Sequence, residues 1–391
     1  MGAQEIAECT AAELHARLRR KTTPAETTAS PDLLILDVRS PESFATGAIQ
    51  GAPLLRHLPA SRFHADPAAA LAALPSSGQI VVVCNHGNSS KQVAGRLREL
   101  GRDALSLHGG MHAWGELVVP RVAARLDEAV IWQFDRVGKG CLSYLIQTPQ
   151  GIWAIDPGRH LGPYLEAIAA AAVPLRRVLD THAHADHLSG GRELARQAGV
   201  GYWLHPFDAL APFELEPAAF DFEPLWEGQR ERLGGLEIRV LHTPGHTLGQ
   251  VSLLVNGAYL LTGDTIFLRS LGRPDLGGRA EAWSRRLHAT LLRLAALPEA
   301  ITVLPGHYAG PGEARAADGV FAASLGELRR ANEALAARSE DEFVAYIQRG
   351  LREIPAPYRV IKRVNLGLES ADAARQDELE LGPNLCALAH A

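Results

Sequence analysis

The sequence predicts an α/β protein with two cored domains. Apolar runs with the character of strands alternate with helical stretches along most of the chain. A cysteine ends one such run in the first hundred residues, and histidines and aspartates follow several others in the central part. The 391 residues suffice for two cores, and 47% hydrophobic with 21% charged residues is ordinary for a folded globular protein.

Residues 1–120 predict a parallel α/β domain. Leu33–Leu36 is a buried strand, Ile80–Val83 is a second strand that ends at Cys84, and helical periodicity runs from Ser89 to Leu100. Between a strand and a helix amino terminus, inward-pointing backbone N–H groups stabilise an anionic sulfur. A reactive cysteine is therefore expected at Cys84. The alternative is a structural residue, because free cysteine is among the most buried residue types.

This segment resembles a single rhodanese domain over about Ala11 to Leu117. The resemblance rests on Asp37-Val38-Arg39, Gly47–Ala52, the Cys84 loop and Gly109–Trp114. It implies that Cys84 carries a sulfane sulfur as a persulfide. Rhodanese loops commonly have an arginine where this chain has Ser89, and Lys91 is the candidate replacement. Thiosulfate is therefore a doubtful donor, and a low-molecular-weight persulfide or a protein partner is the expected sulfur source.

Residues 121–391 form the second predicted domain, in which potential metal ligands follow strand-like runs. Four of them lie in one loop before the helical stretch Arg192–Gln197, and three more follow later strands. The seven are His182, His184, Asp186, His187, His246, Asp264 and His307. Two histidines spaced i, i+2 point the same way from an extended segment. Clustered histidines and aspartates at successive strand ends predict a site for one or two metals.

This pattern resembles the metallo-β-lactamase fold superfamily, with a core at about residues 129–310. The resemblance implies a four-layer αββα sandwich. Within the superfamily, the chain is more similar to the persulfide dioxygenases than to glyoxalase II. The similarity rests on Trp132-Gln133-Phe134, on Ala185 inside the ligand loop and on Leu271–Leu276 after the metal aspartate.

The persulfide dioxygenase resemblance implies one Fe(2+) per chain, held by His182, His246 and Asp264. Two histidines and a carboxylate on one face of an octahedron leave the other face open for substrate and dioxygen. The remaining residues, His184, Asp186, His187 and His307, would then surround the ligands. In the alternative, all seven hold two Zn(2+) ions, whose bridging hydroxide attacks a thioester as in glyoxalase II.

Arg273 and Tyr308 are the predicted substrate-binding residues. Members of the family bind glutathione through an arginine after the metal aspartate and a nearby tyrosine. The alternatives are a loop arginine paired with Asp275 and a tyrosine used for packing. The sequence also departs from the family at Tyr308-Ala309-Gly310, where the aspartate that commonly follows the last histidine is absent.

The predicted function is oxidation of a glutathione-type persulfide by O2 to sulfite and thiol, together with sulfur transfer at Cys84. A metallohydrolase and a non-catalytic sulfur carrier are the alternatives. The net charge of −5 argues against nucleic acid as a partner. The sequence shows no secretory signal and no apolar stretch of membrane-spanning length, so a cytoplasmic location is expected. Members of the family are often homodimers.

Residues 311–391 predict a helical extension. Helical patterns run from Val320 to Ala337 and from Glu340 to Leu351, and the prolines at 355 and 357 are expected to begin an extended tail. Packing over the sheet is the expected role. No role is assigned to Asn365 or Cys386.

Overall fold

A computed structural model describes residues 6–19, 33–315, 317–336, 338–382 and 384–388. The chain divides into two compact units between Leu117 and Val118, and two short later segments group with the first unit. Each unit is described by itself.

The first unit is a parallel five-stranded sheet with helices on both faces. Its strands are β1 (Glu8–Cys9), β2 (Leu33–Asp37), β3 (Leu54–His57), β4 (Gln79–Val83) and β5 (Ala104–Leu107), in the order β1-β5-β4-β2-β3. Its helices are α1 (Ala11–Leu18), α2 (Pro41–Ala45), α3 (Ala60–Ala65), α4 (Pro67–Ala72), α5 (Asn88–Glu99) and α6 (Gly110–Glu116).

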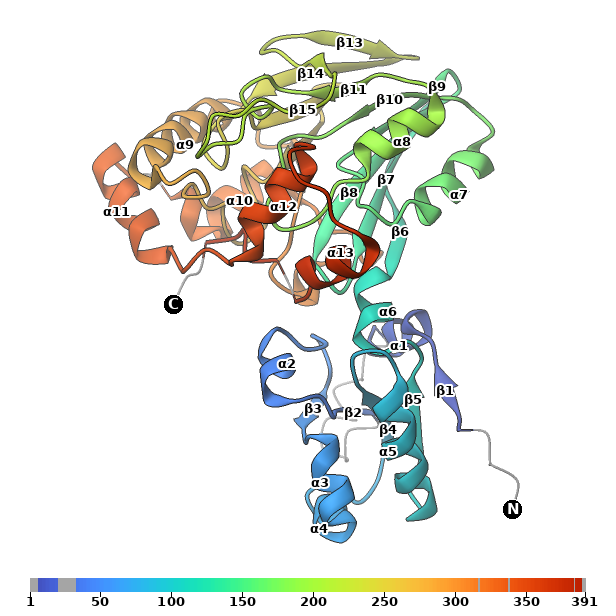
Figure 1. Cartoon of the computed structure of the whole chain (residues 1–391). Helices are drawn as coiled ribbons and strands as arrows, with labels where there is room; N and C mark the ends of the chain where they lie inside the picture. The colour runs from blue at the N-terminus through green and yellow to red at the C-terminus, as the bar shows by residue number, and fades with distance from the viewer. Residues whose placement is uncertain (1–5, 20–32, 316, 337, 383, 389–391) are drawn as a thin grey trace. The chain divides into compact units, whose positions relative to one another are not determined.

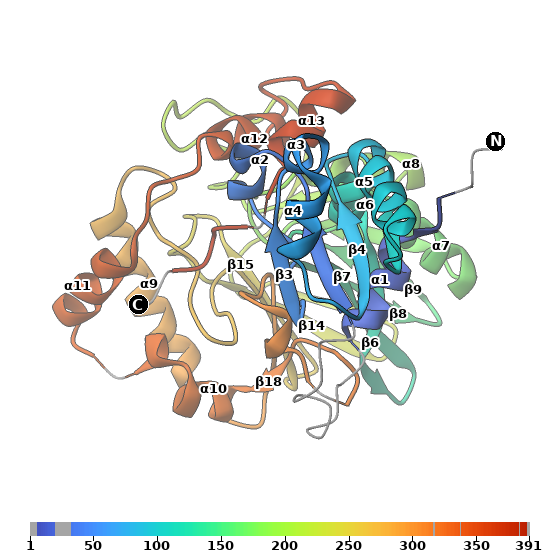
Figure 2. The same cartoon turned by 90° about the horizontal axis from the view of Figure 1, so that it is seen from below.

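Alternate residues of the central strands feed two separate cores. Ile80 and Val82 pack with α3, α4 and α5, whereas Val81 and Val83 pack with α1 and α6. Figure 2 shows the ribbons of α3, α4 and α5 near β4. Side chains alternate across a strand, so a sheet that is covered on both faces requires a continuous apolar run. This requirement explains the unbroken sequence Ile80–Val83.

The second unit places two sheets face to face. The seven-stranded sheet has the order β12-β11-β10-β9-β8-β7-β6, from β6 (Val118–Leu126), β7 (Ala129–Arg136), β8 (Cys141–Thr148), β9 (Gly151–Ile155), β10 (Leu175–Leu179), β11 (Tyr202–Leu204) and β12 (Glu223–Pro224). The six-stranded sheet runs in chain order through β13 (Arg230–Leu233), β14 (Leu236–His242), β15 (Val251–Val255), β16 (Tyr259–Gly263), β17 (Thr302–Pro305) and β18 (Ala323–Ser324). One apolar core, with Ile146 and Leu253 among its members, joins the two sheets.

Helices complete the sandwich. A second apolar cluster packs α7 (Gly162–Ala171) and α8 (Gly191–Ala198) against the outer face of the seven-stranded sheet. Figure 1 shows these helices on one side of the strands, with α9 (Ala280–Ala295) and α11 (Glu340–Gly350) on the other. The α/β prediction is confirmed, with a parallel-sheet first domain and a sandwich second domain.

The C-terminal region differs from the sequence prediction in two places. The helix expected from Val320 begins only after Ser324, as α10 (Leu325–Ala331), because the Gln133 side chain bonds both backbone groups of Phe321 and β18 pairs with β17. The expected extended tail is instead α12 (Pro357–Asn365) and α13 (Ala373–Leu379). Pro357 begins a helix because proline at a first helical position lacks an N–H that would be unpaired anyway. Two short 3-10 turns, η1 (Pro311–Glu313) and η2 (Glu333–Leu335), precede them.

Within the residues that the structure describes, every helix is too short or too polar to cross a membrane.

Candidate metal centre

The loop that carries four of the predicted ligands connects β10 to α8. Asp156, which follows β9 with a φ of 53°, accepts hydrogen bonds from the Thr181 N–H at 2.6 Å and the Thr181 hydroxyl at 2.9 Å. This carboxylate fixes the start of the loop. Because parallel strands end at one edge of a sheet, His182 and the residues after it begin at the edge where β9 also ends.

Three buried atoms face one another at the centre of the site. They are His182 Nε2, His246 Nε2 and Asp264 Oδ2, and none has a hydrogen-bond partner among the described residues. Asp264 Oδ2 lies 3.8 Å from His182 Nε2 and 3.5 Å from His246 Nε2. Buried polar atoms are normally paired, so three convergent unpaired ones fit a shared cation. Two imidazoles and a carboxylate form the donor set both of non-haem iron sites and of some catalytic zinc sites.

The far side of each ligand is anchored. His246 Nδ1 lies 2.9 Å from the Arg273 carbonyl oxygen, which only accepts, so the ring donates there and its Nε2 lone pair faces the centre. Asp264 Oδ1 accepts from His307 Nδ1 at 2.6 Å. Burial lowers the pKa of both His182 and His246, which favours the neutral form that binds metal. Such anchoring orients ligands before the ion arrives.

The other predicted ligands contact one another. Asp186 Oδ1 lies 3.0 Å from His187 Nδ1, and its Oδ2 lies 3.0 Å from His307 Nε2. Burial alone would lower the pKa of His307, but the Asp264 and Asp186 carboxylates raise it well above its ordinary value. His184 Nε2 lies 3.3 Å from Asp156 Oδ1. The structure thus separates the three convergent ligands from a paired set around Asp186.

A fourth member of that paired set was not predicted. Cys141 Sγ lies 3.5 Å from Asp186 Oδ2 and 3.6 Å from His187 Nδ1. No local motif surrounds this cysteine in the sequence, and its position at the start of β8 is the only available signal.

Two further residues hold the ligand loops and were also not predicted. Asp208 is buried and accepts from Ala183 N at 2.8 Å, Thr247 Oγ1 at 2.7 Å and Gly249 N at 2.8 Å, so it ties the His182 loop to the His246 loop.

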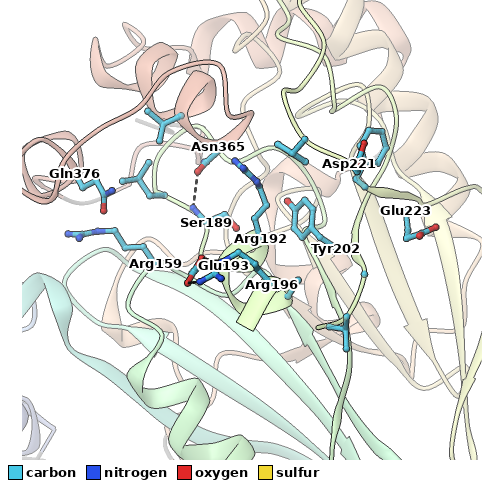
Figure 3. Close-up of a pocket in the computed structure, with 18 residues that line it drawn as sticks. Arg159, Ser189, Arg192, Glu193, Arg196, Tyr202, Asp221, Glu223, Asn365 and Gln376 are labelled. Atoms are coloured by element: carbon cyan, nitrogen blue, oxygen red, sulfur yellow. Dashed lines mark hydrogen bonds and ion pairs between the residues drawn. The ribbon is translucent and has the colours of Figure 1, made fainter. Parts of the chain in front are cut away.

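Asn365 on α12 provides the second tie. Its Nδ2 donates to the carbonyl oxygens of His184 at 3.0 Å and His187 at 2.9 Å, and its Oδ1 accepts from Ser189 N at 2.9 Å. Figure 3 shows the contact with Ser189 as a dashed line, on the wall of a cavity of about 720 Å³. All three bonds go to the backbone of the ligand loop.

Arg273 is buried with every N–H donor engaged. Its guanidinium pairs with Asp275 at 2.7 and 2.8 Å, and it also donates to the backbone carbonyl oxygens of Arg352, Glu353 and Leu385. These contacts favour the alternative of a salt-bridged loop arginine.

Tyr308 is buried as well. Its hydroxyl donates to Asp135 Oδ1 at 2.9 Å, and its ring stacks on Phe321 with 3.8 Å between the centroids. Packing therefore accounts for this tyrosine.

In the first unit, Cys84 is buried in the loop between β4 and α5. Its Sγ accepts from Gly87 N at 3.2 Å and lies 3.3 Å from Ser90 Oγ, which is 2.9 Å from Ser106 Oγ. Lys91 pairs with Glu8 at 3.1 Å. The loop thus offers a backbone N–H and a hydroxyl to an anionic sulfur, while its lysine is already paired.

Family models match both units. One for the metallo-beta-lactamase superfamily matches residues 136–307, and one for a rhodanese-like domain matches residues 10–117. An uncharacterized protein of Mycobacterium leprae is 32% identical over 190 residues, covering 43% of this chain and 86% of the relative. A hydroxyacylglutathione hydrolase of Acidiphilium cryptum is 37% identical over 153 residues, which are 39% of this chain and 58% of that protein.

Two solved structures share the architecture. A metallo-beta-lactamase from Staphylococcus aureus gives a TM-score of 0.56 at 25% identity, covering 62% of this chain and 74% of its own. ETHE1 from Myxococcus xanthus gives a TM-score of 0.50 at 26% identity, covering 61% of this chain and 99% of its own.

Proposed function

Because the chain belongs to the metallo-beta-lactamase superfamily and carries a rhodanese-like domain, we propose that it is a persulfide dioxygenase with an attached sulfurtransferase site. The observation that carries the proposal is the set of three unpaired, buried donor atoms on His182, His246 and Asp264. The sequence resemblance to persulfide dioxygenases supports the same choice, and the likeness to ETHE1 is in keeping with it.

In the proposed reaction, one persulfide, one dioxygen and one water give one thiol, one sulfite and two protons. The S–S bond breaks, the outer sulfur loses four electrons, and dioxygen gains them. Iron(II) held by the three ligands would supply adjacent binding positions for sulfur and oxygen and a path for the electrons. His182 and His246 remain neutral, and the anchored Asp264 supplies the negative charge.

Cys84 would carry the sulfane sulfur as a persulfide. The Gly87 N–H and the Ser90 hydroxyl stabilise the anionic sulfur. Transfer to sulfite would then break the Cys84 S–S bond, form thiosulfate and return the thiol. Sulfite from the metal site is therefore an acceptor for sulfur held at Cys84.

A hydrolase with two metals is the second candidate. His184 Nδ1 has no hydrogen-bond partner among the described residues, whereas His184 Nε2 and His307 Nε2 lie 3.3 and 3.0 Å from the Asp156 and Asp186 carboxylates. A second ion would be held among these nitrogens and carboxylates. The hydroxyacylglutathione hydrolase relatives support this candidate. It requires no oxygen, because the two metals would supply a hydroxide nucleophile for a thioester carbonyl.

Metal content and oxygen uptake distinguish the two candidates. On anaerobically purified protein, we expect about one iron per chain and rapid oxygen uptake when glutathione persulfide is added. Two zinc ions with thioester cleavage and no oxygen uptake would establish the hydrolase.

Two variants test whether sulfur transfer and oxygen uptake occur at separate sites. Cys84→Ser should abolish sulfur transfer and leave oxygen uptake largely intact, whereas Asp264→Ala should remove metal and oxygen uptake but spare transfer. Equal loss of both activities in either variant would contradict the assignment of separate sites.

A further inference from the structure

A small pocket lies beside the ligand loop of the second unit. Its volume is about 290 Å³, and its walls come from the loop at 211–214, the segment 354–363 and Leu276. Ala185, between two of the predicted ligands, lines it and packs in one buried cluster with Leu276 and Tyr358. The pocket is therefore a mostly apolar space in direct contact with the backbone that carries the metal ligands.

One cation in this pocket has no partner. Lys362 lies one helical turn after Tyr358 on α12 and is only 5% exposed, and its ammonium group makes no hydrogen bond or ion pair with another described residue. Arg359 and Arg363, in the same wall, pair instead with Glu214 and Glu216. Lys362 is thus distinguished from its basic neighbours by both its burial and its lack of a direct ion pair.

One carboxylate acts on Lys362 from nearby without a direct ion pair. The Asp208 side chain attracts the ammonium, but both Asp208 oxygens hydrogen-bond to the two ligand loops. Burial lowers the pKa of Lys362, and its charge in turn lowers the pKa values of His182 and His246. A buried charge without a partner is costly, and an anion that enters the pocket would offset that cost.

We infer that this pocket binds the organic part of the substrate, with Lys362 as counter-ion to its carboxylate. The inference rests on the proposed function for its reaction, and it narrows the substrate to a small, carboxylate-bearing thiol or persulfide. A volume of about 290 Å³ is at the lower end for small-molecule sites, which favours a low-molecular-weight carrier over a protein persulfide. Arg273 and Tyr308, already engaged elsewhere, are not needed for this recognition.

The larger cavity of this unit is a weaker candidate for the same role. Its charged residues are largely paired with one another or with neighbours: Glu193 with Arg196, and Arg159 with Asp377 and Glu380. Figure 3 shows Arg159, Glu193 and Arg196 along its wall. An anion entering there would compete with existing carboxylates.

The first test measures binding without turnover. S-methylglutathione, which cannot be oxidised at a persulfide, is titrated calorimetrically into metal-loaded wild type, Lys362→Met and Arg349→Met, whose removed cation is exposed on α11. We expect at least tenfold weaker binding by Lys362→Met and unchanged binding by Arg349→Met. Equal binding by wild type and Lys362→Met, or no binding by wild type, overturns the inference. Should Lys362→Met fail to fold, Lys362→Gln replaces it.

The second test uses oxygen uptake with two persulfides. For glutathione persulfide, we expect Lys362→Met to raise KM at least tenfold with a much smaller change in kcat. For 2-hydroxyethyl persulfide, which lacks a carboxylate, we expect KM to change less than threefold. Equal shifts for both persulfides overturn the inference. If wild type consumes no oxygen with either persulfide, the proposed function fails, and the calorimetric result alone decides whether Lys362 binds a carboxylate.

Discussion

Asp208→Asn should weaken the second unit and its metal site together. The carboxylate accepts three hydrogen bonds, two of them from backbone N–H groups at 2.8 Å. An amide keeps one acceptor oxygen and replaces the other with an NH2 group, so at least one donor then faces a donor. Losing a hydrogen bond to a charged group removes about 1.5 to 3 kcal/mol, and an unsatisfied buried donor adds to that loss. We expect the free energy of unfolding to fall by about 2 to 4 kcal/mol.

Metal affinity should fall in the same variant, because Asp208 joins the loops of two ligands. Removing a group that orients metal ligands typically lowers affinity by about 10- to 100-fold. The assay is competition with a chromophoric chelator, together with chemical denaturation of the metal-free protein. Asp341→Asn is the matched control, because its carboxylate is 86% exposed and pairs with Arg285 at the surface. If Asp208→Asn loses stability but keeps metal affinity within a factor of two, Asp208 supports the fold without positioning the ligands.

Two further predictions concern buried polar groups of the same unit. Asn365→Ala removes three hydrogen bonds to the ligand loop and should lower metal affinity about tenfold, measured by the same chelator competition. An unchanged affinity would show that Asn365 does not position the metal ligands. Burial and the neighbouring His242 lower the pKa of His205 to about 4, below the unfolded value of about 6.5. As the pH falls, His205 is therefore protonated in the unfolded chain before it is protonated in the folded protein. The stabilisation present above pH 6.5 is lost as the pH falls toward 4. In His205→Gln, the free energy of unfolding should fall less between pH 6.5 and pH 4 than in wild type, by at most about 3 kcal/mol. The same dependence of unfolding free energy on pH in both proteins would contradict this prediction.

The sequence was sufficient to place the seven candidate ligands close together, because each follows a strand. His182 and Asp264 follow the ends of β10 and β16, and the ends of strands lie at the edges of sheets even when the packing of the core is not known. Which three of the seven ligands converge could not follow from spacing. That selection depends on hydrogen bonds such as His307 to Asp264, between residues 43 positions apart.

The residues that the sequence analysis missed act across long separations. Asn365 bonds to residues 176 to 181 positions away, and neither it nor Asp208 belongs to a local pattern that marks such a contact. The error at Pro357 has a different cause. Proline ends one helix and begins another with equal ease, so a proline pair alone does not distinguish a tail from a new helix. Because α12 carries both Lys362 and Asn365, the sequence prediction missed an element that lines the proposed substrate pocket.

The two sites differ in the charge that each offers to a substrate. At Cys84 the loop lysine is paired with Glu8 at the surface, and the sulfur is stabilised by a backbone N–H and a hydroxyl, an arrangement that holds one anionic sulfur. Beside the metal ligands, Lys362 is unpaired and buried, an arrangement that favours an anionic carrier. This contrast supports entry of the carrier persulfide at the metal-binding unit.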